Sequence, residues 1–221
     1  MQTFDTPAPI TAVLTIPAGR IQFIAADRAD TTVDVRPTDP ARNRDVKAAE
    51  RTAVTCTDGV LRITTTNPGS KLLGPSGSLE VTVQLPAGSR IEAHTACTEL
   101  RGVGRLGDVA FDGAHRKIKI DEAESLRLTA VDGDVEIGRL NGPAEISTAR
   151  GDITIAEAMR GTVVLRTHSG DISIGVTAGA SAALDAGTGH GRVSNALKNN
   201  GTTDLDIHAT TTQGDITARS L

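Results

Sequence analysis

Apolar and polar residues alternate with a period of two through the second half of the chain. The alternation follows a recurring Gly-Asp pair, most clearly from Gly133 to Ile137, from Gly151 to Ile155 and from Gly170 to Ile174. Successive side chains of a β-strand point to opposite faces, so this pattern is typical of strands with one buried and one polar face. The sequence therefore predicts short strands, each entered through a glycine turn.

The Gly-Asp pair marks an internal repeat. Successive glycines stand 26, 18, 19, 21 and 23 residues apart, which fits stacked strand–turn–strand units with connections of unequal length. We predict that each glycine supplies a left-handed turn conformation and that each aspartate bonds to nearby backbone amides. The weakest copy carries Arg192 in place of the aspartate. The predicted turn residues are Gly107, Asp108, Gly133, Asp134, Gly151, Asp152, Gly170, Asp171, Gly191, Gly214 and Asp215.

Apolar residues recur at the same positions when the last five units are aligned on their glycines. They stand two and four residues after the glycine, and five and seven residues before it. A slip of one residue would turn all of them outward, so a register kept over five units predicts units stacked around one core. The residues predicted to fill that core are Leu128, Val135, Ile137, Ile146, Ile153, Ile155, Leu165, Ile172, Ile174, Val193 and Ile216.

A threonine stands three residues before the glycine in four of these five units, also at an inward position. In stacked units these hydroxyls would lie one strand spacing apart, about 4.8 Å. We predict that they bond to neighbouring hydroxyls or to turn carbonyls rather than to a ligand. This threonine ladder consists of Thr148, Thr167, Thr188 and Thr211.

The N-terminal part is β-rich but less regular. Two copies of a Pro-Ala-Gly sequence, within Ile16 to Ile21 and within Leu85 to Ile91, suit tight reversals between strands. The charged, Ala-rich segment from Asp39 to Arg51 predicts one short surface helix, and Ser70 to Ser78 predicts a loop. Strands are predicted near residues 10–16, 20–25, 31–36, 52–57, 60–65, 79–85 and 89–94.

These patterns predict an all-β fold: a single-domain β-solenoid, or β-helix, of stacked strand–turn–strand repeats. No composition shift marks a linker, so we assign residues 1–221 to one β-repeat domain. Within it, residues 1–94 form the irregular β region and residues 95–221 the regular Gly-Asp repeats.

Composition narrows the range of partners. The 221 residues have a net charge of −4, and the chain contains three Phe but no Trp or Tyr. Nucleic-acid sites need basic surfaces and single strands stack on aromatic side chains, so no nucleic-acid partner is predicted. No apolar run is long enough for a transmembrane segment, and the first residues lack a secretory leader pattern. The sequence therefore predicts a cytoplasmic protein, with Cys56 and Cys97 reduced and in the core.

The file of aspartates after the glycines is the sharpest candidate for a chemical site. Calcium takes six to eight oxygen ligands, and one carboxylate per unit supplies too few, so we interpret the file as structural. The five histidines show no metal-ligand spacing, and no catalytic, cofactor-binding or metal-binding residue is predicted. The prediction for cofactors is none.

The repeat resembles a bacterial family of β-strand-repeat proteins of unknown activity whose members are labelled adhesins. Ser169 to Ile174 carries the Ser-Gly-Asp-Ile-x-Ile form, with Arg150 to Ile155 and Asp132 to Ile137 as variants, and Leu85 to Gly88 is similar to the turn that leads into the repeats. The resemblance covers about residues 80–219. It implies a β-helix-like fold and assigns no functional residues.

The predicted function is a non-enzymatic interaction or scaffold protein, a rigid rod that presents polar rows to a protein partner not named by the sequence. Two alternatives stay open: a carbohydrate-active enzyme on a parallel β-helix, and an accessory to a membrane or envelope-stress system. The last repeat, Gly214 to Ala218, runs almost to the chain end, so its strand edge has no evident cover. We therefore predict a homo-oligomer formed through this C-terminal rung.

Overall fold

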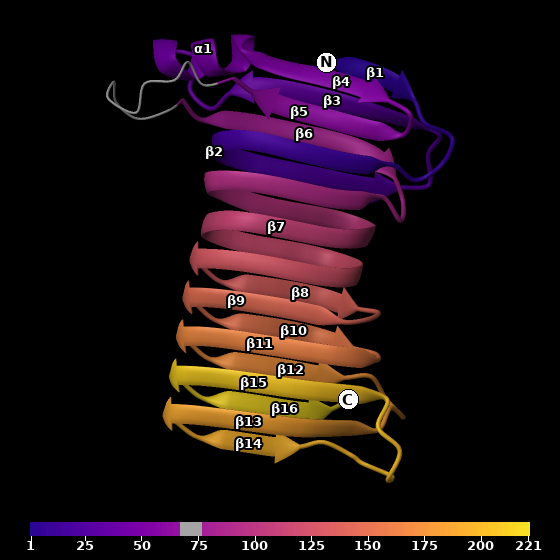
Figure 1. Cartoon of the computed structure of the whole chain (residues 1–221), viewed down its shortest axis with the longest axis vertical. Helices are drawn as coiled ribbons and strands as arrows, with labels where there is room; N and C mark the ends of the chain where they lie inside the picture. Colours follow the sequence, from indigo (N-terminus) through magenta and orange to yellow (C-terminus); the bar gives the residue numbers. More distant parts are fainter. Residues whose placement is uncertain (67–76) are drawn as a thin grey trace.

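The protein is a tall stack of β-strands with a short helix at its N-terminal end (Figure 1). The computed structural model describes residues 1–66 and 77–221, so most of the loop predicted from Ser70 to Ser78 lies outside the described residues. Within the described part, no helix is long and apolar enough to span a bilayer. The elements are β1 (Gln2–Asp5), β2 (Thr11–Ala26), β3 (Asp30–Pro37), α1 (Asn43–Glu50), β4 (Thr52–Thr57), β5 (Val60–Thr65), β6 (Leu79–Pro86), β7 (Arg90–Asp132), β8 (Val135–Leu140), β9 (Ala144–Arg150), β10 (Ile153–Ala158), β11 (Gly161–Ser169), β12 (Ile172–Val176), β13 (Ala182–His190), β14 (Val193–Ala196), β15 (Leu205–Gln213) and β16 (Ile216–Ser220).

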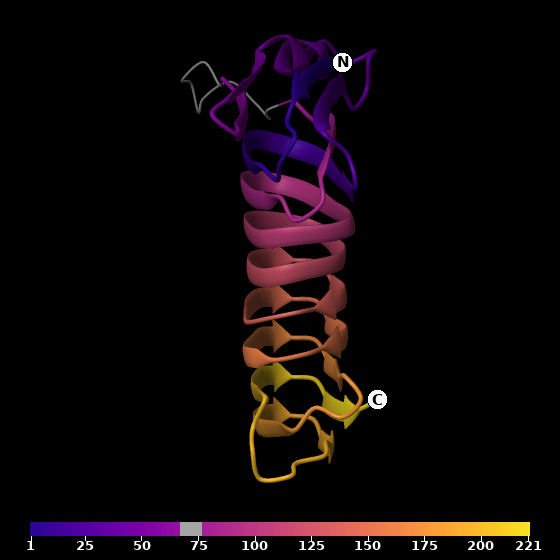
Figure 2. The same cartoon turned by 90° about the vertical axis from the view of Figure 1, so that its right-hand side faces the viewer.

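The chain coils, and each coil, here called a rung, adds one strand to each of two sheet regions. Sheet I contains β8, β10, β12, β16 and β14, and sheet II contains β9, β11, β15 and β13. The long strand β7 bends between the two and pairs with β8 and with β9. Strands within each region are parallel, and Figure 2 shows the rungs edge-on, one above another. The predicted β-solenoid fold class is confirmed.

Inward side chains of the two regions form one continuous apolar core. Ile153 pairs directly with Ile172, and their exposed fractions are 0% and 1%. Ten of the eleven residues predicted for the core are buried. The prediction was wrong for Val193, which is 46% exposed because its rung ends the stack and no strand covers its outer side.

The last two rungs stack in the reverse of their sequence order. β16 lies between β12 and β14, and β15 lies between β11 and β13 (Figure 1). Gly214 to Ala218 is therefore an internal rung, and the prediction that it forms the free end available for self-association was wrong.

Burial explains the reversed order. Ile207 and Ile216 of the β15–β16 rung are 0% exposed, whereas the β13–β14 rung carries Asn195 at the inward position that Ala218 occupies in its neighbour. An amide buried without a partner costs about 1–3 kcal/mol. At the end of the stack Asn195 is exposed, and its Oδ1 accepts the N–H of Leu197 at 3.0 Å. The more polar rung therefore lies outermost.

The N-terminal end of the stack is closed by antiparallel strands and a helix. β1 pairs with β3, β3 with β6, and β4 with β5, all antiparallel. The helix predicted within Asp39 to Arg51 is present as α1. Its Asp45 is 2% exposed and accepts the N–H of Ser78 at 2.9 Å, which holds the helix against the chain entering β6.

The second Pro-Ala-Gly sequence, Pro86 to Gly88, lies in the predicted turn between strands, where the N–H of Ser89 donates to the carbonyl of Pro86 at 3.3 Å. The first Pro-Ala-Gly sequence does not form the predicted reversal. Residues 17–19 lie inside the continuous strand β2, whose first part pairs with β5 and whose second part pairs with β6. The sequence therefore bends the strand from one sheet region to the other, with Gly19 at a φ of 135°. A corner of a rung and a hairpin both need a glycine, and the local sequence does not distinguish them.

We expect Ile172→Ala to lower the free energy of unfolding by about 2–5 kcal/mol, because it leaves a cavity between fully packed rungs. Val193→Ala, at the equivalent position of the end rung, should cost much less. Urea unfolding followed by circular dichroism measures both. Equal losses at the two positions would contradict the core described here.

Candidate functional site: the corner ladder and the groove on sheet II

The corner between sheet II and sheet I is built from the repeated glycines. The φ angles of Gly133, Gly151, Gly170, Gly214 and Gly191 lie between 117° and 156°, a region that disfavours residues with a side chain. The glycines also stack closely, since a Cβ on Gly170 would collide with the carbonyl oxygen of Gly151. Both requirements make glycine necessary at each corner.

Each aspartate at this corner accepts a backbone hydrogen bond from the next rung. Oδ1 of Asp134 accepts the N–H of Asp152 at 3.0 Å, and Oδ1 of Asp152 accepts the N–H of Asp171 at 2.7 Å. Asp171 bonds in the same way to Asp215 at 2.7 Å, and Asp215 to the N–H of Arg192 at 2.8 Å. The carboxylates therefore join rungs, in the order in which the rungs stack. This series of carboxylate–amide bonds is here called the corner ladder.

The threonine ladder supplies a second bond across the same rung boundaries. The hydroxyl of Thr167 donates to the carbonyl of Gly151 at 3.2 Å, and that of Thr211 donates to the carbonyl of Gly170 at 3.0 Å. Thr188 donates to Gly214 at 2.9 Å. Thr148 differs, because it donates within its own rung, to the carbonyl of Arg150 at 3.0 Å.

Gly107 and Asp108 do not belong to this ladder, so that part of the prediction was wrong. The N–H of Gly107 donates to the carbonyl of Ser89, and Oδ1 of Asp108 accepts the hydroxyl of Ser125 at 2.6 Å. Both residues therefore lie at the opposite corner, where sheet I leads into sheet II. The spacing explains the error: 26 residues separate Gly107 from Gly133, about one and a half rungs when the next intervals are 18 and 19.

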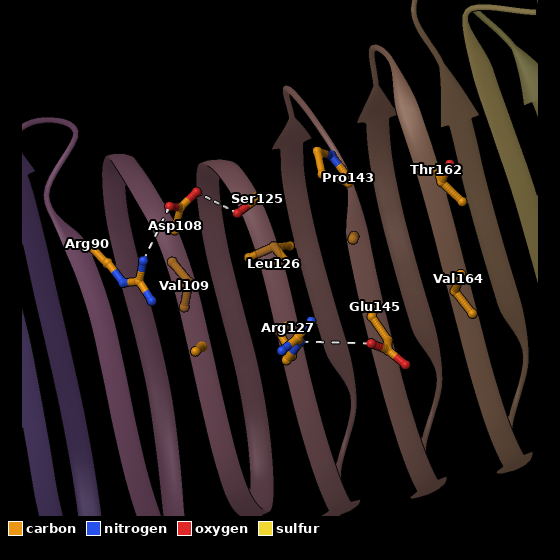
Figure 3. Close-up of a pocket in the computed structure, with 12 residues that line it drawn as sticks. Arg90, Asp108, Val109, Ser125, Leu126, Arg127, Pro143, Glu145, Thr162 and Val164 are labelled. Atoms are coloured by element: carbon orange, nitrogen blue, oxygen red, sulfur yellow. Dashed lines mark hydrogen bonds and ion pairs between the residues drawn. The ribbon is translucent and has the colours of Figure 1, made fainter.

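A shallow groove of about 530 Å³ crosses the outer face of sheet II (Figure 3). Its lining comes from five successive rungs, which place Arg90, Asp108, Arg127, Glu145 and Val164 along the stack. In strand register, Arg127 lies opposite Glu145, and Glu145 lies opposite Val164. The groove thus runs across the strands.

Charged side chains along the groove are paired with one another. Nη1 of Arg90 lies 3.8 Å from Oδ2 of Asp108, and Nε of Arg127 lies 3.8 Å from Oε2 of Glu145. Glu145 also pairs with Arg166 at 3.3 Å. The lining also includes the apolar side chains of Ala110 and Val164. The surface is therefore partly apolar, with its charges locally neutralised.

The groove was not predicted from the sequence, although a signal for it exists. The residues six before the glycine form an outward row, and this row holds Arg127, Glu145 and Val164 in successive units. The alignment that located the core used the positions on either side of this row. Reading the outward positions in the same alignment would have shown a mixed, partly apolar row.

On sheet I, two lysines flank one glutamate near the start of the aspartate file. Hydrogen bonds from Lys117 and Lys119 hold the pKa of Glu136 below its usual range, and the same contact raises the pKa of Lys117. Cys56 and Cys97 are both free and half-buried, and burial raises the pKa of the Cys56 thiol. Among the side chains that the structure describes, which leave out those of residues 67–76 and 114–115, no three His, Cys, Asp or Glu gather in a metal-binding arrangement.

The fold and its corner ladder define a class: a stack of parallel β-rungs held together by a repeated Gly-Asp corner. The chain matches the profile of the Toastrack DUF4097 family over residues 11–219 and belongs to that family. This match confirms the resemblance to a family of β-strand-repeat proteins of unknown activity. No curated protein matches the sequence.

Three solved structures are similar to the chain. A candidate cell adhesion protein from Clostridium sporogenes is 12% identical, with 100% of this chain and 98% of that chain covered and a TM-score of 0.43. A candidate adhesin from Bacteroides fragilis is 14% identical, with coverages of 98% and 95% and a TM-score of 0.46. A candidate adhesin from Parabacteroides distasonis is also 14% identical, with the same coverages and a TM-score of 0.41.

The corner ladder predicts a graded response at Asp152. Asp152→Asn keeps the oxygen that accepts the N–H of Asp171, so stability should change little, whereas Asp152→Ala removes the acceptor and should cost about 1 kcal/mol. Chemical denaturation compares the two variants. Calorimetry should show no calcium affinity that depends on Asp152; tight calcium binding abolished by Asp152→Ala would overturn the structural role.

The lowered pKa of Glu136 predicts a small loss of folding stability in acid. Its folded-state pKa is depressed, so the stability that it contributes is present above its unfolded pKa and is lost as pH falls through the folded pKa. Glu136→Gln should therefore lower the urea midpoint at neutral pH and leave it nearly unchanged at about pH 3. A difference between the two proteins that grows in acid would contradict this assignment.

Proposed function

We propose that this Toastrack protein is a non-enzymatic interaction protein that binds an extended segment of a protein partner along the groove on sheet II. The groove itself is the observation that carries the proposal. It crosses five rungs, so four strand spacings give it a length of about 19 Å. An extended chain of about six residues covers that length.

The lining suits an uncharged peptide that carries both apolar and polar side chains. The charges along the groove already have partners within the protein, so a strongly charged ligand would have to displace Arg127 from Glu145 or Arg90 from Asp108. Ala110 and Val164 offer small apolar contacts along the same groove. The hydroxyls of Ser125 and Thr162 stand beside them as hydrogen-bonding groups.

The rigidity of the scaffold supports the same function. Each of the strands beneath the groove is paired on both sides, with β9 between β7 and β11, and β11 between β9 and β15. The positions of the groove side chains are therefore set by the sheet rather than by loops, so binding costs little ordering of this surface. A segment of six residues makes a small interface, which suits weak and transient contacts.

A photo-reactive amino acid placed at Val164 should capture the partner in living cells, because covalent capture retains weak complexes. The same amino acid at Ser173 on sheet I provides the control at an equally regular strand position. The expected result is a protein cross-linked from Val164 and absent from Ser173. Identical products from both positions would count against the groove.

Paired substitutions test whether the groove carries the affinity for the captured protein. Ala110→Arg with Val164→Glu introduces two charges into the groove, and Thr154→Glu with Ser173→Arg introduces the same charges on sheet I. We expect at least a tenfold weaker affinity for the first variant, equivalent to 1.4 kcal/mol or more, and wild-type affinity for the second. Unchanged binding by the groove variant would refute the proposed function.

A further inference from the structure

The rung formed by β13 and β14 is an insertion into an otherwise regular stack. β12 is followed in space by β16, and β11 by β15, although Thr177 to Asp204 separates them in sequence. Gly170 and Gly214, which stack directly, are 44 residues apart, whereas the stacked glycines of the preceding rungs, Gly133, Gly151 and Gly170, are 18 and 19 apart. Removing the 28 residues from Thr177 to Asp204 and restoring a three-residue corner such as Asn141 to Pro143 would bring this interval to 19.

The inserted rung makes the corner hydrogen bonds of the repeat on the side that faces the stack, but it lacks the acceptor for them on its outer side. Toward the stack, Thr188 donates to Gly214 and the N–H of Arg192 donates to Asp215. On the outer side, Arg192 stands where every other rung of the ladder has the aspartate that would accept a further rung. The corner ladder therefore ends here for a chemical reason, since the guanidinium side chain of Arg192 has no oxygen that could accept the N–H of a further rung.

The connection that leaves the inserted rung folds under the end of sheet II. The N–H of Ala182 donates to the carbonyl of Lys198 at 3.0 Å, and Nδ2 of Asn199 donates to the carbonyl of Ala182 at 3.1 Å. Ser181 bonds through its hydroxyl to the N–H of Asn200, also at 3.0 Å. Backbone groups at the start of β13 that an added strand would need are thus already occupied, and Figure 2 shows this connection below the last rung.

We propose that the inserted rung and its connection, residues 177–204, are a cap that prevents two copies of the protein from pairing end to end. The surface beneath the cap is the edge of β15 and β16. There Leu205, Ile207 and Ile216 are 0% exposed beneath the paired strands of the cap, and Asp215 offers an acceptor to a further rung.

A second copy is the occupant that fits the uncovered edge. Both sheet regions end there in strands whose outer backbone groups now pair with β13 and β14. A two-fold axis would bring the same edge of another copy against it, with strands antiparallel and apolar inner faces continuous. Exposed edges of this kind associate unless they are covered. The oligomer predicted from the sequence would therefore form from the uncapped stack, and we expect the chain that carries the cap to stay a monomer.

The first experiment replaces Thr177 to Asp204 by Asn-Gly-Pro, the sequence of the corner from Asn141 to Pro143. Light scattering after size exclusion should give a monomer of 22.8 kDa for the full chain and twice the monomer mass for the shortened chain. A shortened chain that unfolds cooperatively but stays monomeric would overturn the proposal. A full-length chain that associates through β14 would overturn it too.

A second experiment keeps the chain length and so does not depend on folding of the shortened chain. Arg192→Asp with Asn195→Ile completes the repeat at the last rung and removes the amide that holds Leu197. We expect this variant to self-associate. Its control, Arg166→Asp with Ser147→Ile, likewise replaces an arginine by aspartate and a polar residue by isoleucine, on paired outward positions inside the stack, and should stay monomeric. Monomers from both variants, or equal association of both, would reject the cap.

Discussion

Hydrogen bonding across the corner of each rung fixes the register on which the whole stack depends. Parallel rungs could slide along one another at little cost to the ladder bonds, because every backbone pair is alike. The corner removes this freedom. The carboxylate of Asp152 reaches the N–H of Asp171, and the hydroxyl of Thr167 reaches the carbonyl of Gly151, only in one register. Packing of Ile153 against Ile172 then follows from the same alignment.

The regular half of the fold could be predicted from the sequence because residues in every unit specify the register of the strands. Glycine at a left-handed φ, apolar residues two and four positions later, and threonine three positions earlier recur at spacings of 18 and 19. The stacking order could not be predicted in this way. The rungs of Gly191 and Gly214 share one register, so either could follow Gly170. Which rung lies outermost depends on which of them can leave one side exposed to solvent. Arg192 and Asn195 suit the rung of Gly191 to that position.

The groove shows a different limit. Its residues belong to strands whose inward positions follow the repeat that predicts the fold. The outward positions of the same strands vary from unit to unit. Arg127, Glu145 and Val164 become neighbours only when the units are stacked. A solenoid of this kind separates its two tasks between alternate residues of the same strand: inward residues maintain the stack, and outward residues are free to suit a partner. The sequence repeat therefore describes the scaffold far better than it describes the binding surface.

The reversed order of the last two rungs has a consequence for biosynthesis. A chain leaves the ribosome from its N-terminus at about 5–20 residues per second, so β13 and β14 emerge seconds before the β15–β16 surface on which they finally dock exists. During that interval the free edge of β11 and β12 is the only partner of matching register available to them in the nascent stack. When β15 and β16 emerge, they must either displace β13 and β14 from the edge of β11 and β12 or find that edge still free. Completion of the fold is thus a competition between two rungs for one edge, decided only after translation has reached the end of β16.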